Sequence, residues 1–321
     1  MAPSAADTAA TGVRLAGASR SGQVRTVNQD AYFAGVVGGR PLLLVADGMG
    51  GHRTGEVASA RATETIRAHL AASRAHAPAA LAKALQAANR DVLEEASGDP
   101  RHQGMGTTLT TVLIDDQIAL VGHVGDSRAY LLRDAELRTL TEDHSWVAER
   151  VRQGLLSEDE ARRHRWRNVI TNALGATERF RLDLYHVHLR PGDRLLLASD
   201  GVTALLGEPL LRDVLASGTP EDIVTRLLDA ADERGSPDNV TAVAAVVDEV
   251  REAPKRYELP PEVGWSVQVG DTLGGIREVE DRYPGRGPMR WLRRQPWYPY
   301  RLWILGSAYL ALLLVLFLLL N

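Results

Sequence analysis

The sequence predicts an α+β domain built on antiparallel sheets, followed by one membrane-spanning helix. Three observations lead to this prediction. Short apolar strand patterns alternate with alanine-rich helical patterns over residues 13–250. Three successive strand patterns within residues 107–132 are joined by short polar turns, which indicates an antiparallel meander and disfavours a doubly wound parallel sheet. Residues 302–320 carry no charged side chain, as a membrane span requires.

The individual elements follow from composition and spacing. Compact apolar runs bounded by turn residues predict strands, and longer alanine-rich stretches predict helices. The predicted strands are 42–46, 107–114, 118–124, 129–132, 193–199 and 240–247. The predicted helices are 58–72, 79–95, 146–163 and 220–234. Residues 1–12 lack the apolar block of a signal peptide, so we expect a flexible N-terminus in the cytoplasm.

The composition excludes several kinds of chemistry. The chain has 321 residues and no cysteine, so it can form no disulfide, thiolate-bound zinc site, iron–sulfur cluster or cysteine nucleophile. The net charge of −4 averages two unlike regions. Residues 1–250 carry 27 basic and 34 acidic side chains, whereas residues 251–321 carry ten and seven. An acidic domain with a basic tail argues against nucleic acid as the main partner.

The last 71 residues differ from the domain before them. Residues 251–301 are rich in Pro, Gly and Arg and predict a juxtamembrane linker, with a short strand around 265–269. The 19 residues of 302–320 are long enough, as a helix, to cross the hydrocarbon core. Arginines and aromatic residues precede them, which places the flank and the domain on the cytoplasmic side of a single-pass membrane protein. A buried core helix is the alternative, but this segment is apolar on every face.

Aspartates recur at the ends of the predicted strands. Asp47, Asp126 and Asp200 each follow an apolar run, and the pair Asp238-Asn239 stands just before one. One Asp-Gly pair alone signals only a turn. Four carboxylates gathered at strand ends, however, would repel one another unless cations neutralise them. In a chain without cysteine, Mg²⁺ or Mn²⁺ held by oxygen ligands fits best.

Seven short motifs then occur in a characteristic order. They are Arg25-Thr-Val-Asn28-Gln29-Asp30, Asp47-Gly-Met-Gly-Gly-His52, Gly106-Thr-Thr108, Gly125-Asp-Ser-Arg128, Asn168-Val-Ile-Thr-Asn172-Ala-Leu-Gly175, Ala198-Ser-Asp200-Gly201 and Asp238-Asn-Val-Thr241. Together they resemble the bacterial metal-dependent protein phosphatases of the protein phosphatase 2C type over residues 13–250. The resemblance implies a four-layer α-β-β-α sandwich of two antiparallel sheets flanked by helices, with residues 145–175 as a flap beside the active site.

The resemblance also implies metal ligands. Asp47 matches the carboxylate that bridges two metal ions, and the Gly48 carbonyl matches a ligand of one of them. Asp200 and Asp238 match the remaining carboxylates, and Asp126 matches the carboxylate of a third, weaker site. Two Mn²⁺ or Mg²⁺ ions, with a third in some members, are therefore the expected cofactors.

Further residues are expected to act on the substrate. By resemblance, Arg25 binds the substrate phosphate, Asp30 orders metal-bound water, and His52 lies near the position of the general acid. Gln29 departs from the pattern, because some members place a metal-contacting glutamate there. The spacing around His52 also differs from the shorter loop of other members.

These motifs predict a protein serine/threonine phosphatase that uses metal-activated water and acts on phosphoproteins. By resemblance, Ser/Thr kinases and their targets are the expected partners. Two alternatives are a pseudophosphatase that senses phosphate without efficient catalysis and another two-metal hydrolase, such as a nuclease. The acidic domain disfavours the nuclease. His123 and His144 are expected to be structural. The arginine-rich run 162–167 fits either a solvated helix face or a site that recruits acidic substrates.

Overall fold

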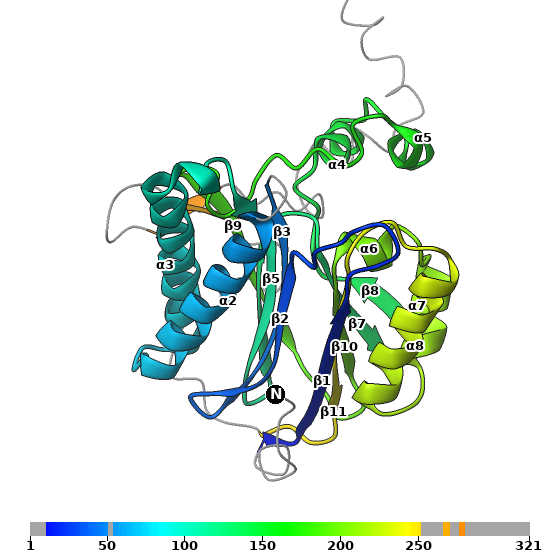
Figure 1. Cartoon of the computed structure of the whole chain (residues 1–321). Helices are drawn as coiled ribbons and strands as arrows, with labels where there is room; N and C mark the ends of the chain where they lie inside the picture. The colour runs from blue at the N-terminus through cyan, green and yellow to red at the C-terminus, as the bar shows by residue number, and fades with distance from the viewer. Residues whose placement is uncertain (1–10, 51–53, 252–265, 270–275, 280–321) are drawn as a thin grey trace, which may run out of the picture. The chain divides into compact units, whose positions relative to one another are not determined.

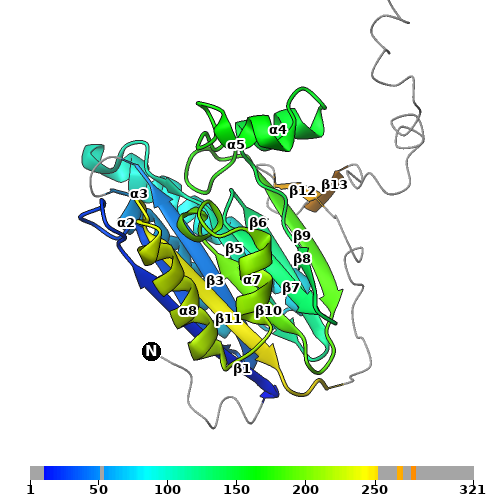
Figure 2. The ribbon, with the colours of Figure 1, turned by 90° about the vertical axis from the view of Figure 1, so that its right-hand side faces the viewer.

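The computed structural model describes residues 11–50, 54–251, 266–269 and 276–279. Two antiparallel sheets lie against each other, and helices cover their outer faces (Figures 1 and 2). The smaller sheet has the order β1-β11-β10-β7-β8. Its strands are β1 (Val13–Arg20), β7 (Arg128–Arg133), β8 (Glu136–Thr139), β10 (Arg194–Ala198) and β11 (Val240–Val247). This arrangement confirms the expected sandwich.

The larger sheet follows the path β13-β12-β9-β6-β5-β3-β2, and β4 pairs with β3 beside that path. Its strands are β2 (Asp30–Val37), β3 (Arg40–Met49), β4 (Gly106–Thr107), β5 (Leu109–Asp115), β6 (Ile118–Val124), β9 (Phe180–His188), β12 (Ser266–Val269) and β13 (Ile276–Val279). The helices are α2 (Thr54–Ala72), α3 (Ala77–Gly98), α4 (Trp146–Arg152), α5 (Glu158–Arg163), α6 (Asp200–Thr203), α7 (Glu208–Leu215) and α8 (Pro220–Glu233), with a 3₁₀ turn η1 (Pro100–His102).

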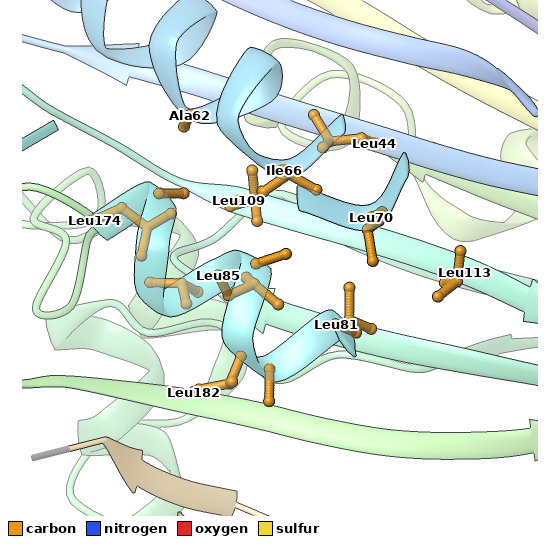
Figure 3. Close-up of a cluster of buried hydrophobic side chains, with 14 of the residues drawn as sticks. Leu44, Ala62, Ile66, Leu70, Leu81, Leu85, Leu109, Leu113, Leu174 and Leu182 are labelled. Carbon is orange, nitrogen blue, oxygen red and sulfur yellow. The ribbon is translucent and has the colours of Figure 1, made fainter. Parts of the chain in front are cut away.

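Strands in the middle of the sandwich are buried on both faces. On β3, Leu42 and Leu44 contact the apolar cluster beneath α2 and α3, whereas Leu43 and Val45 contact the cluster between the sheets. Figure 3 shows the helix-side cluster, in which Leu44 lies among side chains from α2 and α3. Because successive side chains of a strand point to opposite faces, burial on both faces requires the continuous apolar run that the sequence shows.

The single helix predicted over 146–163 is wrong, because the segment forms the two short helices α4 and α5. Gly154 lies between them with a φ of 72°, a conformation that favours glycine. Ser157 then caps α5: its side chain accepts from the Glu160 N–H, and the Glu160 carboxylate accepts from the Ser157 N–H. The glycine ends the first helix and the capping box starts the second.

Only some of the structure predicted for the C-terminal part of the chain falls within the described residues. The strand expected around 265–269 is present as β12, which pairs with β9, and β13 adds a further strand to the sheet. The N-terminal residues 1–10 and the segment 302–320 lie outside the described ranges. Within the described ranges, no helix has the length and apolar character needed to cross a membrane.

Candidate active site

Carboxylates from both sheets meet at one end of the sandwich. Asp47, near the end of β3, is the register partner of Asp30, the first residue of β2. Asp200 follows β10 of the other sheet, and its side chain shares a hydrogen bond with that of Asp47. A second link between the sheets runs from Thr241 Oγ1 on β11 to Asp30 Oδ2, at 2.5 Å. The Asp47–Asp200 contact requires a shared proton, since two ionised carboxylates would repel each other.

Asp126 is tied to Asp47 through its neighbour Ser127. The Ser127 and Thr108 hydroxyl oxygens lie 2.9 Å apart. Thr108 Oγ1 in turn accepts a hydrogen bond from the Asp47 backbone N–H, at 3.0 Å. Asp126 lies two residues after the end of β6 and is 9% exposed. The position of this carboxylate is therefore fixed relative to the end of β3.

Crowding shifts the pKa values of these groups. Loss of solvation, with a contribution from the charge of Asp200, raises the pKa of Asp30 to about 7 and that of Asp126 to about 8. Burial and the charges of Asp30 and Asp200 raise the pKa of Asp47 well above its usual value. Burial and the charge of Asp238 raise the pKa of Asp200. At neutral pH these groups cannot all ionise unless positive charge is placed among them.

Three carboxylate oxygens at this end of the sheets have no hydrogen-bond donor in the structure. They are Asp30 Oδ1, Asp126 Oδ1 and Asp200 Oδ1, and each is buried as an atom. A buried acceptor without a donor is costly, so several together mark a place for a cation. Carboxylate and carbonyl oxygens are the ligands that Mg²⁺ and Mn²⁺ prefer. The donor set therefore fits a divalent-cation centre.

Asp238 faces Arg25. The guanidinium Nε and Nη2 lie 3.0 Å from the two carboxylate oxygens of Asp238, in a bidentate pair. Among the described residues, no three acidic or histidine side chains converge on one point as a closed metal cage. Asp47 and Asp200 contact each other, and Asp238 contacts the arginine instead. The aspartates predicted as metal ligands thus lie at the same end of the sheets, but they do not surround one common point.

Gly48 is a position that only glycine can occupy. A Cβ at this residue would come within 2.0 Å of the Gly55 carbonyl oxygen and 2.6 Å of the Gln29 carbonyl oxygen. The Gly48 N–H donates to that Gln29 carbonyl at 3.0 Å. Gln29 therefore holds β3 through its backbone. Its side chain packs near Gly55, where a Cβ would lie 2.9 Å from Gln29 Cδ.

Asn239 is a site residue whose role the sequence motifs do not reveal. Its Oδ1 accepts from the Gln29 N–H at 2.9 Å, and its Nδ2 donates to the carbonyls of Ser21 and Val27 at 3.0 and 3.1 Å. These three bonds fix the loop that carries Arg25, between β1 and β2. The signal was the Asp238-Asn239 motif, in which only the aspartate was assigned a function.

The remaining sequence predictions divide into two groups. His52 falls in residues 51–53, outside the described part of the chain. His123, on β6, and His144 are both buried, as expected of structural histidines. His144 Nδ1 accepts from the Gly125 N–H and the Asn172 amide, at 3.1 and 2.8 Å, so its Nε2–H donates to Asp183. His144 thereby links the base of the flap to the residue preceding Asp126.

Comparison with known proteins agrees with this geometry. A family model described as protein phosphatase 2C matches residues 17–248. The serine/threonine protein phosphatase PstP of Mycobacterium tuberculosis is 39% identical over 240 residues, covering 74% of this chain and 45% of PstP. The protein phosphatase PhpP of Streptococcus pneumoniae is 36% identical over 235 residues, covering 71% of this chain and 95% of PhpP. The solved catalytic domain of PstP, in complex with two manganese ions, gives a TM-score of 0.68 at 35% identity, covering 74% of this chain and 99% of that one.

The chain therefore belongs to the protein phosphatase 2C family. It spans about half the length of the mycobacterial relative and nearly all of the streptococcal one.

The carboxylate cluster predicts that stability falls with rising pH when divalent cations are absent. Asp30 and Asp126 hold protons more tightly in the folded chain than in the unfolded one, where aspartate titrates near pH 4. Their contribution is complete at low pH and is lost as the pH rises through about 7 and 8. In EDTA, the melting temperature of the full chain should fall between about pH 6.5 and 8.5.

This pH window lies above the range in which His123 titrates and changes stability in the opposite direction. Burial lowers the pKa of His123 to about 3, so its contribution no longer changes above about pH 6.5. Mn²⁺ should restore the melting temperature at the upper pH, and Asp126→Asn should show a smaller decrease in EDTA. A wild-type melting temperature that stays constant or rises across the window would contradict the assignment.

Proposed function

We propose that this chain is a protein serine/threonine phosphatase that hydrolyses phosphoserine and phosphothreonine with two Mn²⁺ or Mg²⁺ ions. One observation carries the proposal: carboxylates from both sheets meet at one end of the sandwich with three buried oxygens that lack donors. Family membership and the two manganese ions bound to PstP support it. Phosphoproteins made by Ser/Thr kinases are the proposed substrates.

The ligands follow from the positions of the carboxylates. Asp47 is proposed to bridge two ions, with the Gly48 carbonyl on one of them and Asp200 and Asp238 completing the set. Asp126 is proposed to hold a further, weaker ion. Bound divalent ions would supply activated water at neutral pH and offset the charge of the phosphate. Asp30, held by Thr241, accepts a proton or a hydrogen bond beside that water.

Arg25 is proposed to bind the substrate phosphate. Its side chain is 51% exposed and its guanidinium already presents two N–H groups to a carboxylate in the geometry that suits a phosphate. The bonds of Asn239 hold the loop that carries Arg25. His52 is the proposed proton donor to the departing serine or threonine oxygen.

The chain is further proposed to be tethered to the cytoplasmic face of the cell membrane. The support is the sequence alone: 19 uncharged residues at 302–320 and the arginine- and tryptophan-containing flank before them.

Turnover by the full chain tests the proposed chemistry. Hydrolysis of p-nitrophenyl phosphate and a phosphothreonine peptide should require Mn²⁺ or Mg²⁺ and stop in EDTA. Asp47→Asn and Asp200→Asn should each lower kcat by about 100-fold or more, because a ligand contributes several kcal/mol to a metal-assisted step. The matched control is Asp213→Asn on α7, an exposed carboxylate that should retain wild-type turnover.

Circular dichroism would confirm that each variant is folded. Activity that persists in EDTA, or wild-type kcat in either metal-ligand variant, would overturn the two-metal mechanism. A folded chain that binds phosphopeptide but turns over no substrate with either ion would favour the pseudophosphatase instead.

Membrane tethering predicts a change of cellular fraction. The full chain should sediment with membranes and require detergent for release, whereas deletion of residues 302–320 should move it to the soluble fraction, since the apolar span is removed. Immunoblots of both fractions measure this. Deletion of residues 1–10 is the control and should leave the distribution unchanged; a full-length chain found in the soluble fraction would refute the tether.

A further inference from the structure

The flap carries a cluster of aromatic rings and arginines that the proposed chemistry does not use. The Trp146 ring stacks on His164 with centroids 4.8 Å apart, and the Trp166 ring meets Trp146 edge-on at 4.7 Å. Arg150 lies over Trp146 at 5.0 Å, and Arg165 lies over Trp166 at 4.6 Å. The rings support one another and hold two guanidinium groups by cation–π contact.

Three arginines in or next to this cluster have no acidic partner among the described residues. Arg163, Arg165 and Arg167 are exposed, and within the described chain none of them forms an ion pair. Their neighbour Arg162 differs, since it pairs with Asp159 at 2.7 Å. The three lie within five positions of the chain, on a domain that carries seven more acidic than basic residues over 1–250. We name Arg163, Arg165, Trp166 and Arg167 the flap surface.

Exposed apolar side chains occur in the same segment of the chain. Trp166 is 41% exposed, Val169 is 45% exposed and Leu155 is 60% exposed. Arginine forks that bind carboxylate or phosphate, combined with exposed aromatic and aliphatic groups, are typical of surfaces that hold a peptide.

The segment that carries the flap surface is attached to the domain next to the carboxylates. The Trp146 N–H donates to the Val169 carbonyl at 2.8 Å, which closes the flap at its base. Two residues earlier, the backbone N–H of His144 donates to the Gly125 carbonyl at 2.7 Å. Gly125 immediately precedes Asp126. Figure 1 shows α4 and α5 beyond the ends of the sheets. A peptide chain lying on the flap surface would therefore continue toward the proposed catalytic centre.

We infer that the flap surface binds an acidic stretch of the substrate protein that flanks the phosphorylated residue. This inference rests on the proposed phosphatase function and gives it a sequence preference. Charge complementarity argues for the acidic class, because the three unpaired guanidinium groups need anionic partners. An anionic membrane would offer similar charge. The base of the flap, however, lies beside Asp126, which favours a peptide segment that continues into the site.

The test compares two phosphothreonine peptides that differ only in three flanking residues, Asp in one and Asn in the other. The variant is R163Q/R165Q/R167Q in the full chain with Mn²⁺. The matched control, R138Q/R212Q/R226Q, removes three arginines from β8, α7 and α8. In the wild type, kcat/KM for the acidic peptide should exceed that for the neutral one by about fivefold to tenfold, the gain expected from three exposed ion pairs.

The flap variant should reduce this ratio to about one while leaving p-nitrophenyl phosphate turnover unchanged, and the control should keep the wild-type ratio. Added salt should lower the ratio in the wild type, because exposed pairs are screened. Fluorescence anisotropy with labelled acidic peptide measures the same preference without turnover. A wild-type chain that hydrolyses no p-nitrophenyl phosphate would refute the proposed function. The anisotropy measurement would still show whether the flap surface binds the acidic peptide.

Three results would overturn the inference. They are a wild-type ratio near one, an unchanged ratio in the flap variant, and a flap variant that loses binding to phosphatidylserine vesicles while its peptide preference is retained.

Discussion

Mutual repulsion among carboxylates at the junction of the two sheets is the constraint on which the proposed centre depends. Asp30 and Asp47 come from one sheet and Asp200 from the other, so the sandwich must close before these groups meet. Burial and mutual charge raise the pKa values of all three groups, so ionising them together costs free energy unless cations lie among them. The free energy that offsets it comes from apolar residues buried between the sheets and beneath the helices. Rigid strands thus position groups that would otherwise move apart.

Backbone contacts keep this end of the sandwich closely packed. Gly48 approaches Gly55, and a Cβ at Gly201 would come within 2.0 Å of the Asn239 carbonyl oxygen. Side chains at either glycine would push the strand ends apart. Asn239 and His144 then fix two surrounding segments, the Arg25 loop and the base of the flap. The loops that would meet substrate are therefore attached directly to the elements that hold the carboxylates.

The sequence predicted the central strands and the position of the aspartates at strand ends, because both depend on local pattern. Continuous apolar runs such as β3 mark strands buried on both faces, and the motifs supplied the order of the aspartates. Strands β1, β2 and β9 were missed, since each mixes apolar residues with small or polar ones that pack only in the folded sheet. The split of α4 from α5 depended on Gly154 and the Ser157 cap. The Arg25–Asp238 pair joins residues 213 positions apart, a contact that no local pattern contains.

Proton release during Mn²⁺ binding distinguishes a metal centre built on these carboxylates from a cluster that binds no ion. Calorimetric titration of the full chain in buffers of different ionisation enthalpy counts both bound ions and displaced protons. Because carboxylates with raised pKa values must lose protons to become ligands, binding at pH 7 should release at least one proton per chain, and the number should fall as the pH rises. At least two ions should bind. Binding without proton release at pH 7, or no binding of Mn²⁺ at all, would contradict the account.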